Sequence, residues 1–185
     1  MTVTDVRLWT VAEYHRMTET GILNPDERVE LIDGQIISMS AKNPPHAATN
    51  LCAADYLRNL LTGLALIRIQ DPIALSTNSE PEPDIAIVRT PNLQYRTHHP
   101  YPADIFWLIE YANTTLRKDL NEKKRVYAQA GIEEYWVVNL QIPELIVFRD
   151  LTIDTYQSET RLATGHISPL SFPDIQIDVT KLFTV

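Results

Sequence analysis

Cysteine and long apolar runs are both scarce in this sequence, and each scarcity removes a class of protein. Cys52 is the only cysteine among 185 residues, so an internal disulfide is impossible and the chain suits a reducing cytoplasm. No stretch approaches the roughly 20 apolar residues of a membrane span. The opening residues, MTVTDVRLW, lack the basic and apolar regions of a signal peptide. We therefore expect a cytoplasmic protein without a membrane segment, in which Cys52 is a buried, unreactive thiol.

Glycine and basic residues are also in short supply. Five glycines leave no G-x-G-x-x-G or Walker pattern for cradling phosphates, and a single cysteine allows no zinc site of the Cys and His type. The 16 Lys and Arg residues face 24 Asp and Glu residues, which gives a net charge of −8. This balance opposes general attraction to nucleic acid, although a local basic rim or bound metal ions can reverse the field at one site.

What the sequence does contain is enough apolar material for one domain over residues 1–185. A capping box that begins at Thr10 predicts a helix over 11–19. The Asp-Gly dipeptide at 33–34 is the strongest two-residue hairpin signal, and it predicts two short strands on either side.

The remaining pattern mixes strands with two longer helices. One helix follows Pro44 and Pro45 and ends near Gly63, and another covers 116–131. The first of these has the apolar stripe Leu51, Ala54, Leu57 and Leu61, and further strands are expected at 64–70, 72–75, 84–88, 104–112, 134–140, 144–150 and 152–158. The loop over 89–102 exceeds usual lengths. This order predicts an α/β fold of the mixed α+β kind, with helices on a mixed sheet.

Four acidic residues stand where an apolar side chain would be the simpler choice; they are Glu30, Asp84, Glu110 and Asp119. An unpaired buried carboxylate is costly, so each needs a cation, strong donors or a metal. Two carboxylates at the ends of neighbouring strands, such as Asp84 and Glu110, form an oxygen-ligand set for Mg²⁺ or Mn²⁺. The structural alternative is that Asp84 accepts backbone donors and Glu110 caps a helix or pairs with an arginine. Spacing alone leaves both interpretations open.

The helix expected over 116–131 supplies a candidate cation. At about 100° per residue, its apolar stripe includes Lys123, three residues after Leu120 and four before Tyr127. Such a lysine either extends to solvent or points toward the carboxylates, and helical geometry does not decide between the two. The basic residues at 124–125 are expected on the solvated face.

The histidines carry a weaker signal. His46 lies at the start of the second helix, where it can either reach a site or cap the helix locally. His98 and His99 lie in the long loop without carboxylates at ligand spacing. A Cys-His nucleophile is disfavoured, because Cys52 is expected in the core.

Several motifs occur together in one order: RVELIDG, PPH, SEPEPDIAIV, LIEYA, KDLNEKKRVYAQAGIEEYW and FPDIQIDVTKLF. Together they resemble the Uma family of restriction-endonuclease-like proteins, from about residue 8 to the end, although the short pieces PD and IE alone are not specific. That family is similar to the PD-(D/E)XK nuclease superfamily. The resemblance therefore implies a restriction-endonuclease-like core, in which a mixed sheet is flanked by helices.

The resemblance also implies a catalytic set, which consists of Glu30, His46, Asp84, Glu110 and Lys123. In it Asp84 and Glu110 are Mg²⁺ ligands, and Glu30 matches an additional acidic position that is a third candidate ligand. The superfamily pattern expects a lysine two residues after Glu110, where this chain has Ala112. In the family a lysine four residues before a tyrosine takes its place, and here that residue is Lys123.

These residue types suit metal-dependent hydrolysis of DNA phosphodiester bonds. Mg²⁺ or Mn²⁺ on Asp84 and Glu110 would polarise the phosphate and lower the pKa of a bound water. Lys123 would orient that water or stabilise transition-state charge, and Glu30 would hold a second metal or position Lys123. The resemblance further implies a homodimer, since restriction-type nucleases often pair so that two sites face two strands.

Two other functions remain to be distinguished. A nuclease-like fold can act without catalysis as a binding or interaction module, which the acidic composition and the lack of a DNA-recognition domain allow. A glycosidase-type pair of carboxylates would act without a metal and would need aromatic sugar platforms nearby. Trp107 and Trp136 lie within strand runs and are expected in the core, which disfavours the glycosidase.

Overall fold

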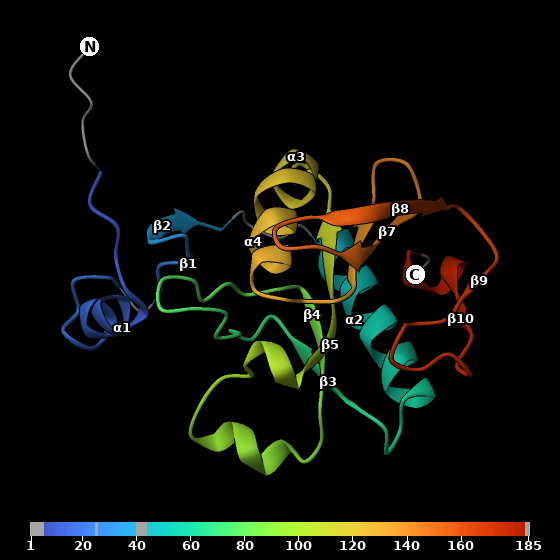
Figure 1. Ribbon diagram of the computed structural model, residues 1–185, viewed down its shortest axis with the longest axis horizontal. Coiled ribbons are helices and arrows are strands. Elements are labelled where there is room, and N and C mark those ends of the chain that lie inside the picture. Colours follow the sequence, from blue (N-terminus) through green and yellow to red (C-terminus); the bar gives the residue numbers. More distant parts are fainter. Residues whose placement is uncertain (1–5, 25, 40–43, 184–185) are drawn as a thin grey trace.

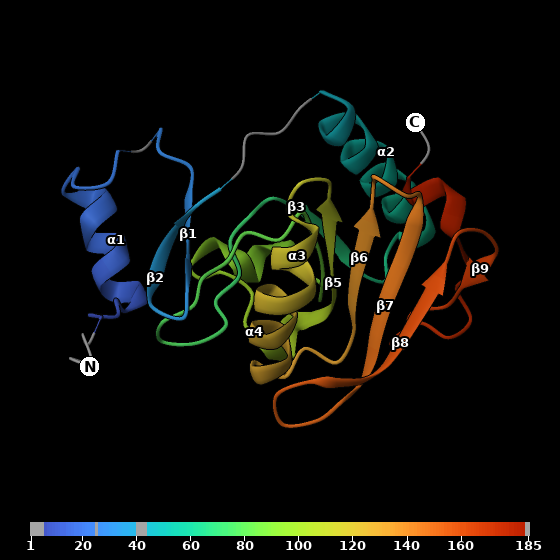
Figure 2. The same ribbon diagram turned by 90° about the horizontal axis from the view of Figure 1, so that it is seen from above.

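A six-stranded sheet forms the centre of the protein in a computed structural model that describes residues 6–24, 26–39 and 44–183. The strands lie in the order β3-β4-β5-β6-β7-β8. Figure 1 shows the whole chain, and Figure 2 shows β5, β6, β7 and β8 side by side. The bounds of the strands, from β3 to β8, are Leu66–Ile69, Ile85–Val88, Ile105–Ala112, Tyr135–Asn139, Glu144–Leu151 and Tyr156–Leu162. Neighbours pair antiparallel except β5 and β6, which are parallel. The sheet is therefore mixed, as the sequence predicted.

The parallel pair requires a crossover, and the helical segment between β5 and β6 supplies it. This segment consists of α3 (Leu116–Lys118), a π-helical turn (Asp119–Lys123) and α4 (Lys124–Gln129). It covers one face of the sheet, whereas α2 (Pro44–Leu60) lies on the other face (Figure 2). Each helix packs into a separate apolar cluster, and the two clusters share the sheet between them.

Strand β5 is buried on both faces, which explains its nearly continuous apolar run. Trp107 and Ile109 belong to the cluster on the α2 side, and Leu108 and Ala112 belong to the cluster on the α4 side. Side chains alternate along a strand, so Glu110 shares its parity with Leu108 and Ala112. Its carboxylate therefore extends from the face that the crossover helix covers.

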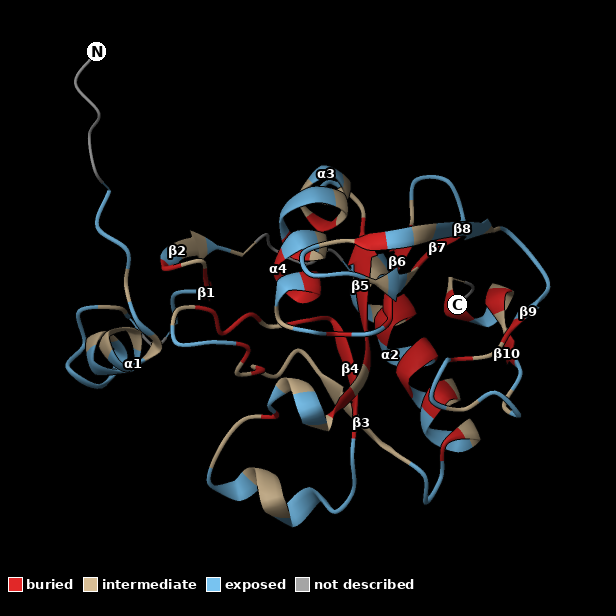
Figure 3. Cartoon of the chain, viewed as in Figure 1, coloured by how far each residue is buried: buried red, intermediate tan, exposed pale blue. Residues whose placement is uncertain are grey.

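The N-terminal elements lie beside the sheet, where α1 (Val11–Glu19) has no buried residue (Figures 1 and 3). The hairpin of β1 (Val29–Ile32) and β2 (Gln35–Ser38) has the predicted turn, with positive φ at Asp33 and Gly34. All four residues of β1 are buried. The hairpin contacts the segment before β4 through a hydrogen bond in which the amide of Glu80 donates to the Leu31 carbonyl at 2.8 Å.

Cys52 is exposed, so the prediction of a buried thiol was wrong. The buried stripe of α2 runs through Asn50, Ala53 and Leu57. At about 100° per residue, this stripe turns Cys52 to the opposite side and leaves Leu51 exposed as well. Of the predicted stripe, Ala54, Leu57 and Leu61 are buried and only Leu51 is not, because polar Asn50 takes the inward place at this end of the helix.

Other differences lie outside the site. The strand expected at 72–75 is absent, because the amides of residues 73, 74 and 75 donate separately to Pro81, Pro100 and Ser79. Two 3₁₀ turns that were not predicted lie in and just after the long loop, at Asn92–Arg96 and Pro102–Asp104. Three further short elements that were not predicted follow β8; they are β9 (His166–Ile167), β10 (Ile177–Asp178) and the 3₁₀ turn Val179–Leu182. Among the described residues, no helix is both long and apolar enough to span a membrane.

Candidate functional site

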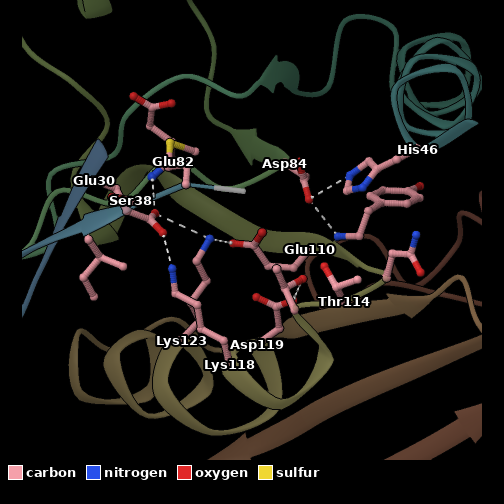
Figure 4. A pocket seen from close by; sticks show the side chains of 15 residues that line it. Glu30, Ser38, His46, Glu82, Asp84, Glu110, Thr114, Lys118, Asp119 and Lys123 are labelled. Carbon is pink, nitrogen blue, oxygen red and sulfur yellow. Dashed lines mark hydrogen bonds and ion pairs between the residues drawn. The ribbon is translucent and has the colours of Figure 1, made fainter. Parts of the chain in front are cut away.

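A polar cavity of about 260 Å³ opens where the hairpin, the start of α2, the end of β5 and the crossover helix meet. It is lined by all five residues of the predicted catalytic set, which are Glu30, His46, Asp84, Glu110 and Lys123 (Figure 4). The structure thus brings together residues that lie up to 93 positions apart in the sequence. His98 and His99 do not line it.

The pairing of β4 with β5 places the two carboxylates of the metal hypothesis side by side. Ile85 lies opposite Ile109 in the antiparallel register, so Asp84, one residue before β4, comes next to Glu110. The amide of Tyr111 donates to Asp84 Oδ2 at 2.9 Å. This backbone donor fixes Asp84 relative to the strand that carries Glu110.

Side chains from α2 and from the end of β3 hold Asp84 from the other side. His46 Nε2 lies 3.5 Å from Asp84 Oδ2, and Asn50 Nδ2 lies 3.4 Å from Oδ1. Gln70 donates to the same Oδ1 at 3.1 Å. Burial opposes ionisation of Asp84, but the hydrogen bonds from His46 and Tyr111 lower its pKa below the usual value. Asp84 is therefore held as a carboxylate at neutral pH.

Lys123 extends from the π-helical turn into the cavity and is only 5% exposed. Its Nζ lies 2.8 Å from Glu110 Oε1 and 3.5 Å from Glu30 Oε2. Tyr127, one turn further along, donates its hydroxyl to Glu110 Oε1 at 2.7 Å. Of the two orientations that the sequence left open, Lys123 thus points toward the carboxylates. Burial alone would lower the pKa of Lys123, but Glu110 and Glu30 raise it, and the side chain stays cationic.

A second lysine, which the sequence analysis did not identify, reaches the same site. Lys118 Nζ lies 2.8 Å from Glu30 Oε1, and the amide of Glu82 donates to Glu30 Oε2 at 3.2 Å. In a regular α-helix, residues 118 and 123 would point about 140° apart. The π-helical turn between them bonds residue i to i+5, so both lysines reach Glu30. Burial opposes ionisation of Glu30, but Lys123 and Lys118 lower its pKa.

The neighbouring basic residues lie further from the cavity. Arg125 is exposed, as predicted, and forms an ion pair with Asp33. Lys124 is half-buried, with its ammonium 4.8 Å from the centre of the Phe148 ring. Neither lines the cavity. The predicted difference in direction between Lys123 and its two successors is therefore present in the structure.

Negative charge exceeds positive charge in the cavity. Its lining contains five acidic residues and two lysines, namely Glu30, Glu82, Asp84, Glu110, Asp119, Lys118 and Lys123. Burial, followed by the charges of Asp84 and Asp119, raises the pKa of Glu110 to about 8 despite the opposing effect of Lys123. Burial also raises the pKa of Asp119. An additional cation beside Asp84 and Glu110 would offset this repulsion.

The side chains in the cavity suit an open metal site with few protein ligands better than a site that the protein encloses. Among the described residues, no group of three or more His, Cys, Asp or Glu side chains is arranged to enclose a metal ion. Mg²⁺, however, is commonly held by one or two carboxylates, with water and substrate phosphate as the other ligands. Asp84 and Glu110 fit that role. Both oxygens of Glu30 already accept hydrogen bonds or ion pairs from the protein, and so do both oxygens of Asp84. The role of each carboxylate as a metal ligand therefore stays a prediction.

Comparison with known proteins identifies the family. The Uma2 family model, described as "Putative restriction endonuclease", matches residues 11–180. The chain belongs to the Uma2 family. A crystal structure of a "putative nuclease belonging to DUF820" from Anabaena variabilis ATCC 29413 is similar in fold. It has a TM-score of 0.73 and 14% sequence identity, and the match covers 94% of this chain and 97% of that one. No curated protein matches the chain.

These comparisons confirm the resemblance and the restriction-endonuclease-like fold that the motifs implied. The position of the tryptophans also agrees with the sequence analysis. Trp107 and Trp136 are fully buried with their ring centres 5.6 Å apart, and neither lines the cavity. Neither tryptophan is therefore placed as a platform for a sugar in this cavity.

Proposed function

We propose that this Uma2 family member is a metal-dependent endonuclease that hydrolyses phosphodiester bonds of DNA, with Mg²⁺ or Mn²⁺ as cofactor. The observation that carries the proposal is the buried contact between Lys123 and Glu110, at 2.8 Å, beside Asp84 on the adjoining strand. A buried cation next to a pair of carboxylates is an unfavourable arrangement for stability alone. It is the arrangement that phosphoryl transfer requires, since charge must be stabilised at the reacting phosphorus.

The protein groups have distinct roles in this mechanism. Asp84 and Glu110 would hold the metal, which when bound supplies Lewis acidity toward the phosphate and a more acidic water. Lys123 stays protonated and acts by electrostatic stabilisation of the developing negative charge rather than as a general base. Tyr127 fixes Glu110 through its hydroxyl. Glu30 positions Lys123, since its other oxygen is held by Lys118.

His46 completes the set as a positioning residue for Asp84. Its Nε2 lies 3.5 Å from Asp84 Oδ2, and its ring centre lies 6.2 Å from that of Tyr111. The contact with Asp84 lowers the pKa of that carboxyl and thereby keeps the ligand ionised. The proposed assignment thus uses all five residues of the predicted set.

Cleavage assays with a matched variant test this proposal. Purified protein is incubated with supercoiled plasmid, linear duplex and single-stranded DNA in Mn²⁺, in Mg²⁺ and in EDTA. We expect cleavage in the metal-containing reactions, no cleavage in EDTA, and a loss of at least about 100-fold in rate for Asp84→Asn, a size typical of losing one electrostatic group in a catalytic site. The proposal is wrong if no form of DNA is cut, or if Asp84→Asn cuts as fast as the wild type.

A second candidate is a nuclease fold that binds a partner without catalysis. It is favoured by the protein donors that already occupy Glu30 and one oxygen of Glu110. Calorimetric titration with Mn²⁺ separates the two functions. The enzyme predicts heat of binding that Asp84→Asn abolishes, whereas a flat trace for the wild type supports the binding module.

The proposed enzyme acts as a homodimer in the cytoplasm. The dimer follows from the resemblance, because two paired sites can face the two strands of a duplex, and the single cysteine suits a reducing compartment. Light scattering after size-exclusion chromatography measures the assembly directly. A dimer gives twice the 21.1 kDa of one chain, and a mass of 21.1 kDa at working concentration contradicts it.

A further inference from the structure

An open groove continues from the cavity along the outer side of the crossover helix. It is lined by Thr114, Thr115, Arg117, Lys118, Asn121 and Glu122. Thr114, Thr115 and Lys118 also line the cavity, so the groove and the cavity are continuous. Lys118 lies at the junction, with its side chain 23% exposed and its Nζ on Glu30. Thr114, Thr115 and Lys118 are thus the residues that border both the cavity and the groove.

The groove contains three charged residues, Arg117, Lys118 and Glu122, in a molecule with a net charge of −8. Lys118 is paired with Glu30, so Arg117 is the cation left for a ligand. Arg117 is exposed and has no ion-pair partner among the described residues. Its guanidinium is therefore available, and the planar fork of an arginine matches two phosphate oxygens. Thr114 is also exposed, and its hydroxyl adds a neutral donor at the entrance.

We propose that this groove binds the phosphate next to the scissile one, with Arg117 as the main contact and Lys118 located between the groove and the cavity. This inference rests on the proposed function. The cavity of about 260 Å³ is smaller than the roughly 300–1,000 Å³ of pockets that enclose a whole small ligand. It has room for a reacting diester, and a polymeric substrate must continue outside it. The substrate class is therefore a nucleic acid strand with an intact phosphate on the Arg117 side.

Binding without metal tests the groove independently of catalysis. Fluorescence anisotropy in EDTA measures the affinity of full-length protein for a labelled oligonucleotide at several salt concentrations. Loss of one phosphate contact lowers the slope of log K against log salt by about 0.7–0.9, which corresponds to about five- to eightfold weaker binding near 0.1 M salt. We expect this change for Arg117→Ala and a larger one for Arg117→Glu. Arg161→Ala is the control, because Arg161 is exposed on β8, an edge strand of the sheet, and lines neither the cavity nor the groove.

A minimal substrate provides the second readout. Bis(p-nitrophenyl) phosphate is a diester without a neighbouring phosphate, so its hydrolysis by the metal-loaded protein should be the same in wild type and Arg117→Ala. For an oligonucleotide, the same variant should raise KM about five- to eightfold with little change in kcat. A general structural defect would lower the turnover of both substrates.

The outcomes separate this inference from the proposed function. If the wild type cuts DNA and Arg117→Ala binds and cuts like Arg161→Ala, the groove inference is wrong and the nuclease assignment stands. If the wild type binds nucleic acid with an Arg117-dependent salt slope but never cuts it, the groove is supported and the nuclease assignment fails. If the wild type neither binds nor cuts, both are wrong.

Discussion

The buried ion network around Lys123 is the most informative feature at the scale of single residues. Lys123 lies between Glu110 and Glu30, and Lys118 neutralises the far side of Glu30. Buried ion pairs contribute little net stability compared with apolar side chains of the same size, but breaking one leaves a costly isolated charge. The network is therefore expected to serve the chemistry of the site and to be sensitive to the loss of either partner.

Replacing the lysine with an apolar residue of similar length tests this cost. Lys123→Met leaves Glu30 and Glu110 without their shared cation. At about pH 9, above the pKa of about 8 of Glu110 in the wild type, we expect a loss of about 3–5 kcal/mol in the free energy of unfolding, as for other broken buried pairs. Urea denaturation followed by tryptophan fluorescence measures the loss. The control is Lys123→Met combined with Glu110→Gln, which removes the isolated charge and should recover part of the stability. A single variant as stable as the wild type would contradict the network.

At the scale of elements, the β1–β2 hairpin is the part that delivers Glu30 to the cavity. Its turn brings Gly34 close to the chain ahead of α1, where the Trp9 amide donates to the Gly34 carbonyl at 2.8 Å. A Cβ at position 34 would meet Leu8 Cβ at 2.6 Å. The hairpin thus depends on a glycine for its conformation and for close packing.

Gly34→Ala tests how much the close packing of the hairpin turn contributes to the free energy of unfolding. The positive φ of +74° costs an alanine roughly 1–2 kcal/mol, and the contact with Leu8 adds to this cost. Gly21→Ala is a matched control, because Gly21 has nearly the same φ, +73°, and nothing within 4 Å of its Cβ position. We expect Gly34→Ala to lower the unfolding free energy by at least 1 kcal/mol more than Gly21→Ala. Equal losses would show that the close packing is unimportant.

The elements that were predicted correctly are each marked by a short sequence feature within the element itself. The helix over 11–19, the hairpin and β5 follow from a capping box, an Asp-Gly turn and a continuous apolar run. The place of Lys123 on the packed face of the helix follows from an apolar stripe, which left open whether its ammonium pointed to solvent or to the carboxylates. By contrast, Lys118 could not be found, because a π-helical turn changes the helical phase between the two lysines. The inward position of Asn50 was missed because its partner, Asp84, lies 34 residues away.

At the scale of the whole molecule, the topology explains why the site lies where it does. The antiparallel pair β4–β5 sets the two carboxylates side by side, and the single parallel pair forces a crossover helix back over β5. The hairpin and α2 close the cavity from other directions (Figure 4). Four separate stretches of the sequence, 30–39, 46, 82–84 and 110–123, therefore contribute to one polar cavity, in a fold shared with the DUF820 structure.

The single-turnover rate of DNA cleavage in Mn²⁺, compared between the wild type and Lys123→Met, measures whether the buried lysine takes part in metal-dependent cleavage. The comparison is made at 25 °C, where far-UV circular dichroism confirms that the variant is folded. We predict metal-dependent cleavage by the wild type and a rate at least about 100-fold lower for the variant, because a buried cation that stabilises transition-state charge is lost. Cleavage at equal rates, or no cleavage by folded, metal-loaded wild type, would contradict the account.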